Sequence, residues 1–321
     1  MKIRLSEKMK LWNLIRWILA VLMLLALPLA VFSPARAETH PLALDMTVKG
    51  DPWQPDGWIG DWEYQDDSIH AVLYESSYQP RPSKERVKIR CVVVDIKDPS
   101  QLRTTMSNES YTDPAQARSM TMAKYVNAIA AMNGDFVKYS YDFGYVVRQG
   151  VFYRDALDTQ KYPRDVLVID DAGDFSVVPS ATSASMAAFL AEMEAAGRKP
   201  VNTFTFGPAL IIGGEVQDVS GSAEFEPNLC NQRICLCQLD TLKYAIVQAD
   251  GDSPKSLGFS LPKLAEYVHS WLGELGYSVK VAYNLDGGAS THLIMHNRLV
   301  NKNNASRGIS DLIYFASAAG E

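Results

Sequence analysis

The chain has 321 residues, of which 47% are hydrophobic and 21% charged, a balance typical of a globular protein with a full core. Six of the 31 basic and one of the 37 acidic residues fall within residues 1–37, so the remaining 284 residues carry a formal net charge of −11. This acidic balance argues against nucleic acid or an anionic lipid surface as the main partner.

The first residues have the pattern of an export signal. Five Lys and Arg residues precede an uncharged apolar run over residues 17–32, and Ala35-Arg36-Ala37 follows. Small residues at Ala35 and Ala37 suit signal peptidase, and the run is shorter than the roughly 20 residues that span a bilayer. The pattern predicts a signal peptide over residues 1–37 and a secreted or cell-envelope protein. The alternative is an uncleaved N-terminal anchor, which would be the chain's one contact with the membrane.

Residues 38–85 have an irregular pattern, with aromatic residues among Pro, Gly and Asp. We predict an aromatic-rich lead-in segment that either packs its aromatic side chains on the domain or forms a loosely held extension. A boundary is expected near residues 78–84. The rest of the chain, residues 86–321, is predicted to form one domain.

From Arg86 onward, short apolar runs alternate with turn residues, and helical periodicity is confined to three stretches. The fold class is therefore predicted to be α+β, with a mixed, strand-rich sheet and three or so helices in a single domain. Asp113-Pro114 and Ser260 with Pro262 are typical helix starts. Helices are predicted over residues 113–127, 185–196 and 261–275, hairpins over 145–153 and 166–179, and strands over 87–96, 128–132, 203–212, 233–239, 244–248, 279–285, 292–295 and 312–316.

The chain has four cysteines. Cys91 lies in an apolar run and is predicted to be a buried thiol. Cys235 and Cys237 lie two apart in a predicted strand, so their side chains point the same way but are too far apart to pair easily. A disulfide from Cys230 to Cys235 or Cys237 across a short turn is an open alternative.

Polar residues and glycines follow several of the apolar strands, where a rigid sheet can hold a binding loop. Each such segment alone is explained by a tight turn. In the last of them a strand delivers Asp286, and Gly287 and Gly288 let a ligand approach the backbone, where successive N–H groups can form an anion-binding nest. The segments lie at residues 131–136, 205–210, 248–252 and 284–291.

Together, and in this order, these segments resemble the phosphodiester glycosidase family, which is related to the enzyme that removes N-acetylglucosamine from N-acetylglucosamine-1-phosphodiesters and includes exopolysaccharide biosynthesis-like proteins. The resemblance covers residues 90–316. This chain has Asp135 and Ala289 where the family more often has Gly, and His292 where a small or apolar residue is expected. The motifs that carry the resemblance are Asn133-Gly134, residues 205–210, Arg233, Asp250-Gly251, Leu275-Gly276, residues 284–288 with Ser290, and Arg307.

The resemblance implies a hydrolase that cleaves the bond between an anomeric carbon and a phosphodiester oxygen, and the N-terminal pattern adds that it is exported. It implies that Asp286 is the principal catalytic carboxylate, with Asp250 as its partner. Arg233 and Arg307 would clamp the phosphate, because guanidinium binds it bidentately. Asn133 and the amides of Gly287 and Gly288 would orient the sugar or bind an oxygen. The remaining substrate-binding candidates are Gly134, Asp135, Thr205, Ser290 and His292.

Several alternatives accompany this hypothesis. No cofactor is implied, but a Ca²⁺ held by Asp135, Asp250 or Asp252 stays open. Ser290 with His292 does not form the elbow of a serine hydrolase, and His292 with His296 lacks a placed third zinc ligand. The expected substrate is a sugar phosphate or a cell-envelope glycopolymer. The alternative function is a non-catalytic module that binds such glycopolymers.

Overall fold

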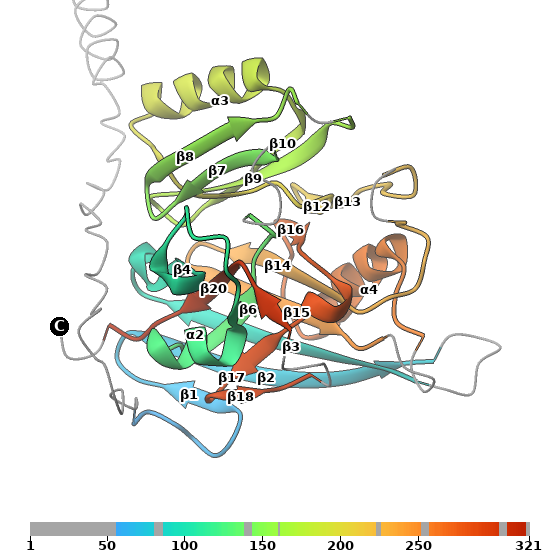
Figure 1. Cartoon of the computed structure of the whole chain (residues 1–321). Coiled ribbons are helices and arrows are strands. Elements are labelled where there is room, and N and C mark those ends of the chain that lie inside the picture. The colour runs from blue at the N-terminus through green and yellow to red at the C-terminus, as the bar shows by residue number, and fades with distance from the viewer. Residues whose placement is uncertain are drawn as a thin grey trace, which may run out of the picture. The chain divides into compact units, whose positions relative to one another are not determined.

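The computed structural model describes residues 56–79, 86–137, 143–159, 161–222, 226–251, 257–301 and 307–318. The predicted signal peptide and the first part of the predicted lead-in segment, up to residue 55, lie outside the described residues. No helix in these ranges is long and apolar enough to cross a membrane. The predicted α+β class is confirmed, since strands predominate and three α-helices lie among them in the described part of the chain (Figure 1).

The largest element is an antiparallel sheet with the strand order β1-β2-β3-β15-β14-β16-β12-β13. Its central strands are buried almost throughout because both faces of the sheet are covered. The strands are β1 (Glu63–Gln65), β2 (Ile69–Tyr78), β3 (Val87–Ile96), β12 (Ala209–Ile212), β13 (Glu215–Val216), β14 (Arg233–Asp240), β15 (Lys243–Ala249) and β16 (Val281–Asn284).

A second antiparallel sheet, in the order β18-β17-β6-β20-β4, faces the first across the main core. Val92 and Ile246 of the large sheet lie in one buried cluster with Met132 and Ile313 of the second. The sequence predicted one mixed sheet, whereas the strands divide among several sheets and all the pairs described are antiparallel. The strands of the second sheet are β4 (Leu102–Met106), β6 (Ala130–Asn133), β17 (Leu293–Met295), β18 (Arg298–Leu299) and β20 (Asp311–Phe315).

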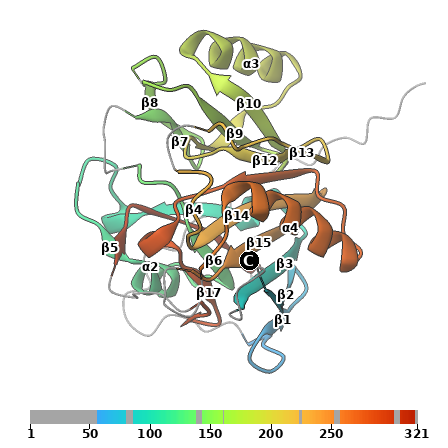
Figure 2. The same ribbon diagram turned by 90° about the vertical axis from the view of Figure 1, so that its right-hand side faces the viewer.

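Helices cover the outer faces of the sheets. α4 (Leu261–Glu274) begins at Ser260, whose hydroxyl accepts a hydrogen bond from the backbone of Lys263, and packs its apolar face on the large sheet (Figure 2). α2 (Ser119–Tyr125) packs on the second sheet, and α3 (Ser183–Ala195) on a third. This third sheet has β10 (Phe175–Ala181), β9 (Arg164–Asp170) and β11 (Pro200–Phe204), and beside it lies the hairpin of β7 (Gly144–Arg148) and β8 (Val151–Ala156).

Three of the four cysteines lie in the core beneath α4. Cys91, Cys235 and Cys237 are buried there, as predicted for Cys91, and the Sγ atoms of Cys235 and Cys237 lie 3.9 Å apart, in hydrogen-bond contact but without a disulfide bond. Burial raises the pKa of the Cys91 and Cys237 thiols. Cys230 is exposed and also free, so the alternative of a disulfide from Cys230 is wrong.

The helix predicted from Asp113 begins later than expected. The carboxylate of Asp113 accepts a hydrogen bond of 2.9 Å from the backbone N–H of Ala115, which closes a local turn instead of capping a helix. The residues before α2 then form β5 (Ala117–Arg118), which pairs with β19 (Gly308–Ile309).

Two strand predictions also need correction. The strand expected over residues 203–212 is divided between β11 and β12, because Gly207 has a φ of 68° that interrupts an extended chain. No strand was predicted in residues 38–85, yet β1 and β2 extend the large sheet there. Tyr64 is buried in the main core and Trp58 packs against it.

Candidate functional site

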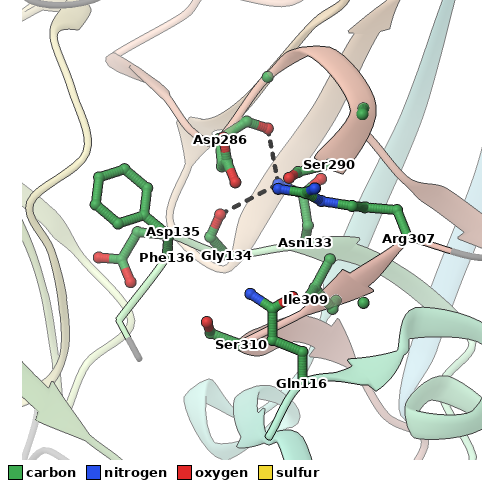
Figure 3. Close-up of a pocket in the computed structure, with 13 residues that line it drawn as sticks. Gln116, Asn133, Gly134, Asp135, Phe136, Asp286, Ser290, Arg307, Ile309 and Ser310 are labelled. Atoms are coloured by element: carbon green, nitrogen blue, oxygen red, sulfur yellow. Dashed lines mark hydrogen bonds between the residues drawn. The ribbon is translucent and has the colours of Figure 1, made fainter. Parts of the chain in front are cut away.

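A cavity of about 280 Å³ lies where the two large sheets meet. β6 ends at Asn133 and β16 at Asn284, and the loops that follow them bring Asp135 and Asp286 to the cavity (Figure 3). Arg307 and the residues of β19 form another part of its wall. The lining residues are Gln116, Asn133, Gly134, Asp135, Phe136, Asp286, Gly287, Ala289, Ser290, Arg307, Gly308, Ile309 and Ser310.

Asp286 is the carboxyl group whose surroundings most suggest chemistry. Burial raises its pKa to about 6, and the charge of Asp135 acts in the same direction. The hydroxyl of Ser290, which hydrogen bonds to the Asp286 carboxyl, and the charge of Arg307 oppose the shift. The side chain of Arg307 extends across the cavity toward Ser290 and Asp286 (Figure 3). A carboxyl group and a guanidinium, both of them candidates from the sequence, therefore face the same cavity.

Asn133 lines the cavity, but its amide is engaged in holding the loops together. Its Nδ2 donates hydrogen bonds to the backbone carbonyls of Asp286, at 2.8 Å, and Gly134, at 3.2 Å. Its Oδ1 accepts one from the backbone of His292 at 3.0 Å. This geometry indicates a residue that positions the Asp286 loop, whereas the sequence predicted that Asn133 would orient the sugar or bind an oxygen.

Asp135 is held by a buried arginine that the sequence analysis did not identify. Arg148 donates from Nη2 to both Asp135 and Asp311, at 2.8 Å in each case, and its guanidinium lies 4.3 Å over the ring of Phe204. The other oxygen of Asp135 accepts a hydrogen bond of 3.2 Å from the backbone of Thr205. Asp135 thus lines the cavity with its carboxylate fixed from behind.

Gly134 makes room for this arrangement. A Cβ atom added there would overlap the carboxyl group of Asp311. The N–H of Gly134 also donates to the backbone carbonyl of Asp311 at 3.0 Å. Glycine at this position is therefore explained by the close approach of Asp311.

The N–H groups of Gly287 and Gly288, which were predicted to form an anion-binding nest, are already used in hydrogen bonds within the protein. The N–H of Gly287 bonds to the carboxyl group of Asp286, and the N–H of Gly288 donates to the carbonyl of Gln232 at 3.0 Å. Gly287 lines the cavity and Gly288 does not. Both glycines shape the loop that carries Asp286.

Asp250 does not line the cavity with Asp286, contrary to the sequence prediction. Its carboxylate accepts a 2.8 Å hydrogen bond from Arg90 and one of 3.1 Å from Gln248. β15, which Asp250 follows, is separated from β16 by β14. Two strand spacings of about 4.8 Å each separate the two strand ends, and Arg90 draws the carboxylate toward β3.

Arg233 also differs from its predicted role. It is buried, and its guanidinium donates to the backbone carbonyls of Phe259, Leu229 and Glu226. Burial lowers its pKa. Arg233 therefore holds backbone segments beside the Gly287 loop and is not among the residues that line the cavity.

Two further candidates lie behind the cavity wall. Thr205 bonds through its hydroxyl to the backbone of Tyr145 and through its N–H to Asp135. His292 is fully buried and is joined to Asn133 through its backbone. Neither residue lines the cavity. The sequence predicted that both contact the substrate, whereas the structure gives them a supporting place behind the wall.

Within the described ranges, no group of three or more His, Cys, Asp or Glu residues is placed to hold a metal ion. Asp252, part of the Ca²⁺ alternative, lies outside those ranges. His296 stacks on Trp58 with ring centroids 3.9 Å apart. The histidine pair considered for zinc thus gains no third ligand in the part of the chain that is described.

A family model described as phosphodiester glycosidase matches residues 126–316. Among solved structures, the catalytic domain of zebrafish N-acetylglucosamine-1-phosphodiester alpha-N-acetylglucosaminidase, auto-inhibited by its pro-peptide, is 14% identical, with a TM-score of 0.59 over 80% of this chain and 87% of that one. A hypothetical protein from Synechocystis is 14% identical, with a TM-score of 0.48 over 77% of this chain and 62% of that one. A putative exported protein from Burkholderia pseudomallei is 15% identical, with a TM-score of 0.47 over 74% of this chain and 75% of that one.

A search of curated proteins found no match. The zebrafish structure shares the fold, and the family model spans more than half of this chain, including every cavity residue except Gln116. The chain belongs to the phosphodiester glycosidase family.

Proposed function

We propose that this protein hydrolyses the bond between the anomeric carbon of a sugar and a phosphodiester oxygen. The proposed substrates resemble N-acetylglucosamine-1-phosphodiesters and belong to cell-envelope or exopolysaccharide material. The observation that carries the proposal is the pairing of Asp286, whose pKa is raised to about 6, with Arg307 across one cavity. Membership of the family supports the reaction class, and the sugar and the phosphate-linked group are part of the proposal.

In the proposed reaction, Arg307 binds the phosphate and Asp286 stabilises the oxocarbenium-like centre or orients the attacking water. A phosphodiester leaves as a weakly basic anion, so the reaction needs less help from a general acid than ordinary glycoside hydrolysis. Asp135 is the second carboxyl group that lines the cavity, in the place that the sequence analysis assigned to Asp250. Arg148 and Thr205 hold it in position.

Turnover of a synthetic N-acetylglucosamine-1-phosphodiester by the purified protein tests the proposal. Asp286→Asn keeps the size of the side chain and removes its charge, so we expect the rate to fall by about 10²–10³-fold or more while the fold is retained. A folded protein that binds sugar phosphates without turning over any diester would instead support a binding module. Wild-type rates in Asp286→Asn would contradict the proposed role of this carboxylate.

We further propose that the protein is exported, on the basis of the pattern in residues 1–37. N-terminal sequencing of protein recovered outside the cytoplasm is expected to begin at Glu38. A start at Met1 would indicate that the segment remains as an anchor.

A further inference from the structure

Asp311, the first residue of β20, is fully buried behind the cavity. One of its carboxyl oxygens, Oδ2, accepts hydrogen bonds from Nε of Arg148 at 3.1 Å and from Nη2 at 2.8 Å. The other, Oδ1, is buried and has no hydrogen-bond partner among the residues that the structure describes. An ionised oxygen in that place loses its hydration without gaining a donor, which costs more than burying a neutral carboxyl group.

The guanidinium of Arg148 hydrogen bonds to two carboxyl groups behind the cavity. Arg148 bonds Asp135 as well as Asp311, and its remaining N–H groups donate to two backbone carbonyls. All five of its N–H donors are therefore used. A single positive charge cannot balance two ionised carboxylates, and Asp286 brings a third acidic group to the same cavity. The cluster thus favours one bound proton, and Asp311 has the unbonded oxygen that can carry it.

We propose that Asp311 is protonated when the cavity binds its substrate, and that Arg148, hydrogen-bonded to the neutral Asp311 carboxyl group, positions Asp135 while leaving the cavity receptive to an anion. The proposal rests on the proposed function in one respect, because a phosphodiester is the anion in question. Ionisation of Asp311 adds a buried negative charge behind the cavity and weakens binding of that anion. Asp311 is accordingly a positioning residue, since it acts through Arg148 and through its charge state.

The surroundings of Asp311 support this assignment. Burial raises its pKa to about 8; the charge of Arg148 opposes the shift, and the charges of Asp135 and Asp286 add to it. Among the described residues, these three groups, from β7 and from the loops after β6 and β16, are the charged neighbours that most affect the pKa of Asp311. We therefore expect Asp311 to be neutral below about pH 8 and to gain its charge above that value.

Isothermal titration of the protein with N-acetylglucosamine-1-phosphate between pH 7 and 9.5 tests the proposal. The second phosphate pKa is about 6, so the charge of the ligand stays constant over this range. The wild-type Kd is expected to rise about tenfold as Asp311 ionises. Asp311→Asn has the shape of the protonated group at every pH, and it should bind at pH 9.5 as tightly as at pH 7.

Asp170→Asn is the matched control. Asp170 is another buried aspartate paired with an arginine, Arg198, but it does not line the cavity. This variant should retain the wild-type weakening above pH 8. A wild-type Kd that does not change with pH would overturn the proposal, as would an unchanged weakening in Asp311→Asn. The wild-type titration alone decides the matter if Asp311→Asn fails to fold.

Absence of any binding in the wild type would count against the proposed function, and the proton on Asp311 is then tested by stability. The folded pKa lies above the ordinary value of 3.8, so the folded state binds more protons than the unfolded state between these values. Wild-type stability therefore falls as pH rises through this window, and Asp311→Asn lacks that loss. The urea midpoint of the wild type should fall relative to Asp311→Asn between pH 5 and pH 9. A constant difference between the two midpoints would contradict the proposal.

Discussion

The side-chain amide of Asn133 donates a hydrogen bond of 2.8 Å to the backbone carbonyl of Asp286, which joins the end of β6 to the end of β16. The two residues lie 153 positions apart in the chain. Because this bond links the two large sheets, the place of Asp286 in the cavity depends on both of them. Variants near the site should therefore divide into those that change the charge environment of Asp286 and those that move it.

Ser290→Ala belongs to the first kind and should shift the pH–rate profile. The Ser290 hydroxyl lowers the Asp286 pKa, against burial, which raises it to about 6. We expect wild-type kcat to fall below about pH 6, where Asp286 is protonated, and the fall to begin at higher pH in the variant. Measuring kcat from pH 4.5 to 8 checks this. Ser310→Ala, in the same cavity, should leave the profile in place, and an unshifted profile in Ser290→Ala would argue against Asp286 as the titrating group.

Arg307→Ala should weaken substrate binding and transition-state stabilisation together, because the phosphate is negative in both states. We expect kcat/KM to fall about 10²-fold. Arg298→Ala provides the control, since Arg298 is exposed and pairs with Asp61 at 2.9 Å. Equal kcat/KM values for the two variants would remove Arg307 from the proposed mechanism.

Asp250→Asn separates the role predicted from sequence from the one seen in the structure. Asp250 is buried against Arg90, so the change should lower the free energy of unfolding by about 1–3 kcal/mol. The value of kcat/KM should stay within a few-fold of wild type. Urea denaturation and steady-state kinetics measure both quantities. A loss of kcat/KM of about 10²-fold with unchanged stability would indicate that Asp250 takes part in catalysis, as the sequence predicted.

Gly134→Ala belongs to the second kind of variant. Its Cβ would meet the Asp311 carboxyl group, so the free energy of unfolding should fall by about 1–3 kcal/mol and activity should fall with it. Gly273→Ala is the control, because an added Cβ in α4 meets nothing within 4 Å. That change should raise stability by up to about 1 kcal/mol. Equal thermal midpoints for the two variants would contradict the predicted overlap.

The elements that the sequence predicted well are those with strong local patterns. β3, β14 and β15 are nearly continuous apolar runs, and α4 has an apolar stripe with a serine cap. β4 was missed because its sequence, Leu102–Met106, alternates weakly and its buried Arg103 and Thr104 resemble surface residues. Local propensity cannot distinguish a polar side chain that tertiary contacts satisfy from one that water satisfies.

The candidate site was predictable only in part, for a related reason. Asn133 ends one apolar strand and Asp286 closely follows another, and this pattern is visible in the sequence. Arg148 gives no such signal, because it lies in a hairpin and meets Asp311 across 163 residues. The side chain of Arg233 points to the carbonyl of Leu229, and that of Asp250 points to Arg90. The positions of Arg233 and Asp250 at strand ends do not predict these orientations.

Cys230 is the one exposed thiol among four cysteines, and the other three are enclosed beneath α4. Thiol reagents require an accessible thiolate, so a maleimide at neutral pH will modify one position of the folded chain. Cys230 follows Leu229, whose carbonyl accepts a 2.9 Å hydrogen bond from Arg233. A fluorophore attached there would report on the backbone segment beside the Asp286 loop, and the native sequence already provides this attachment point without removal of any other cysteine.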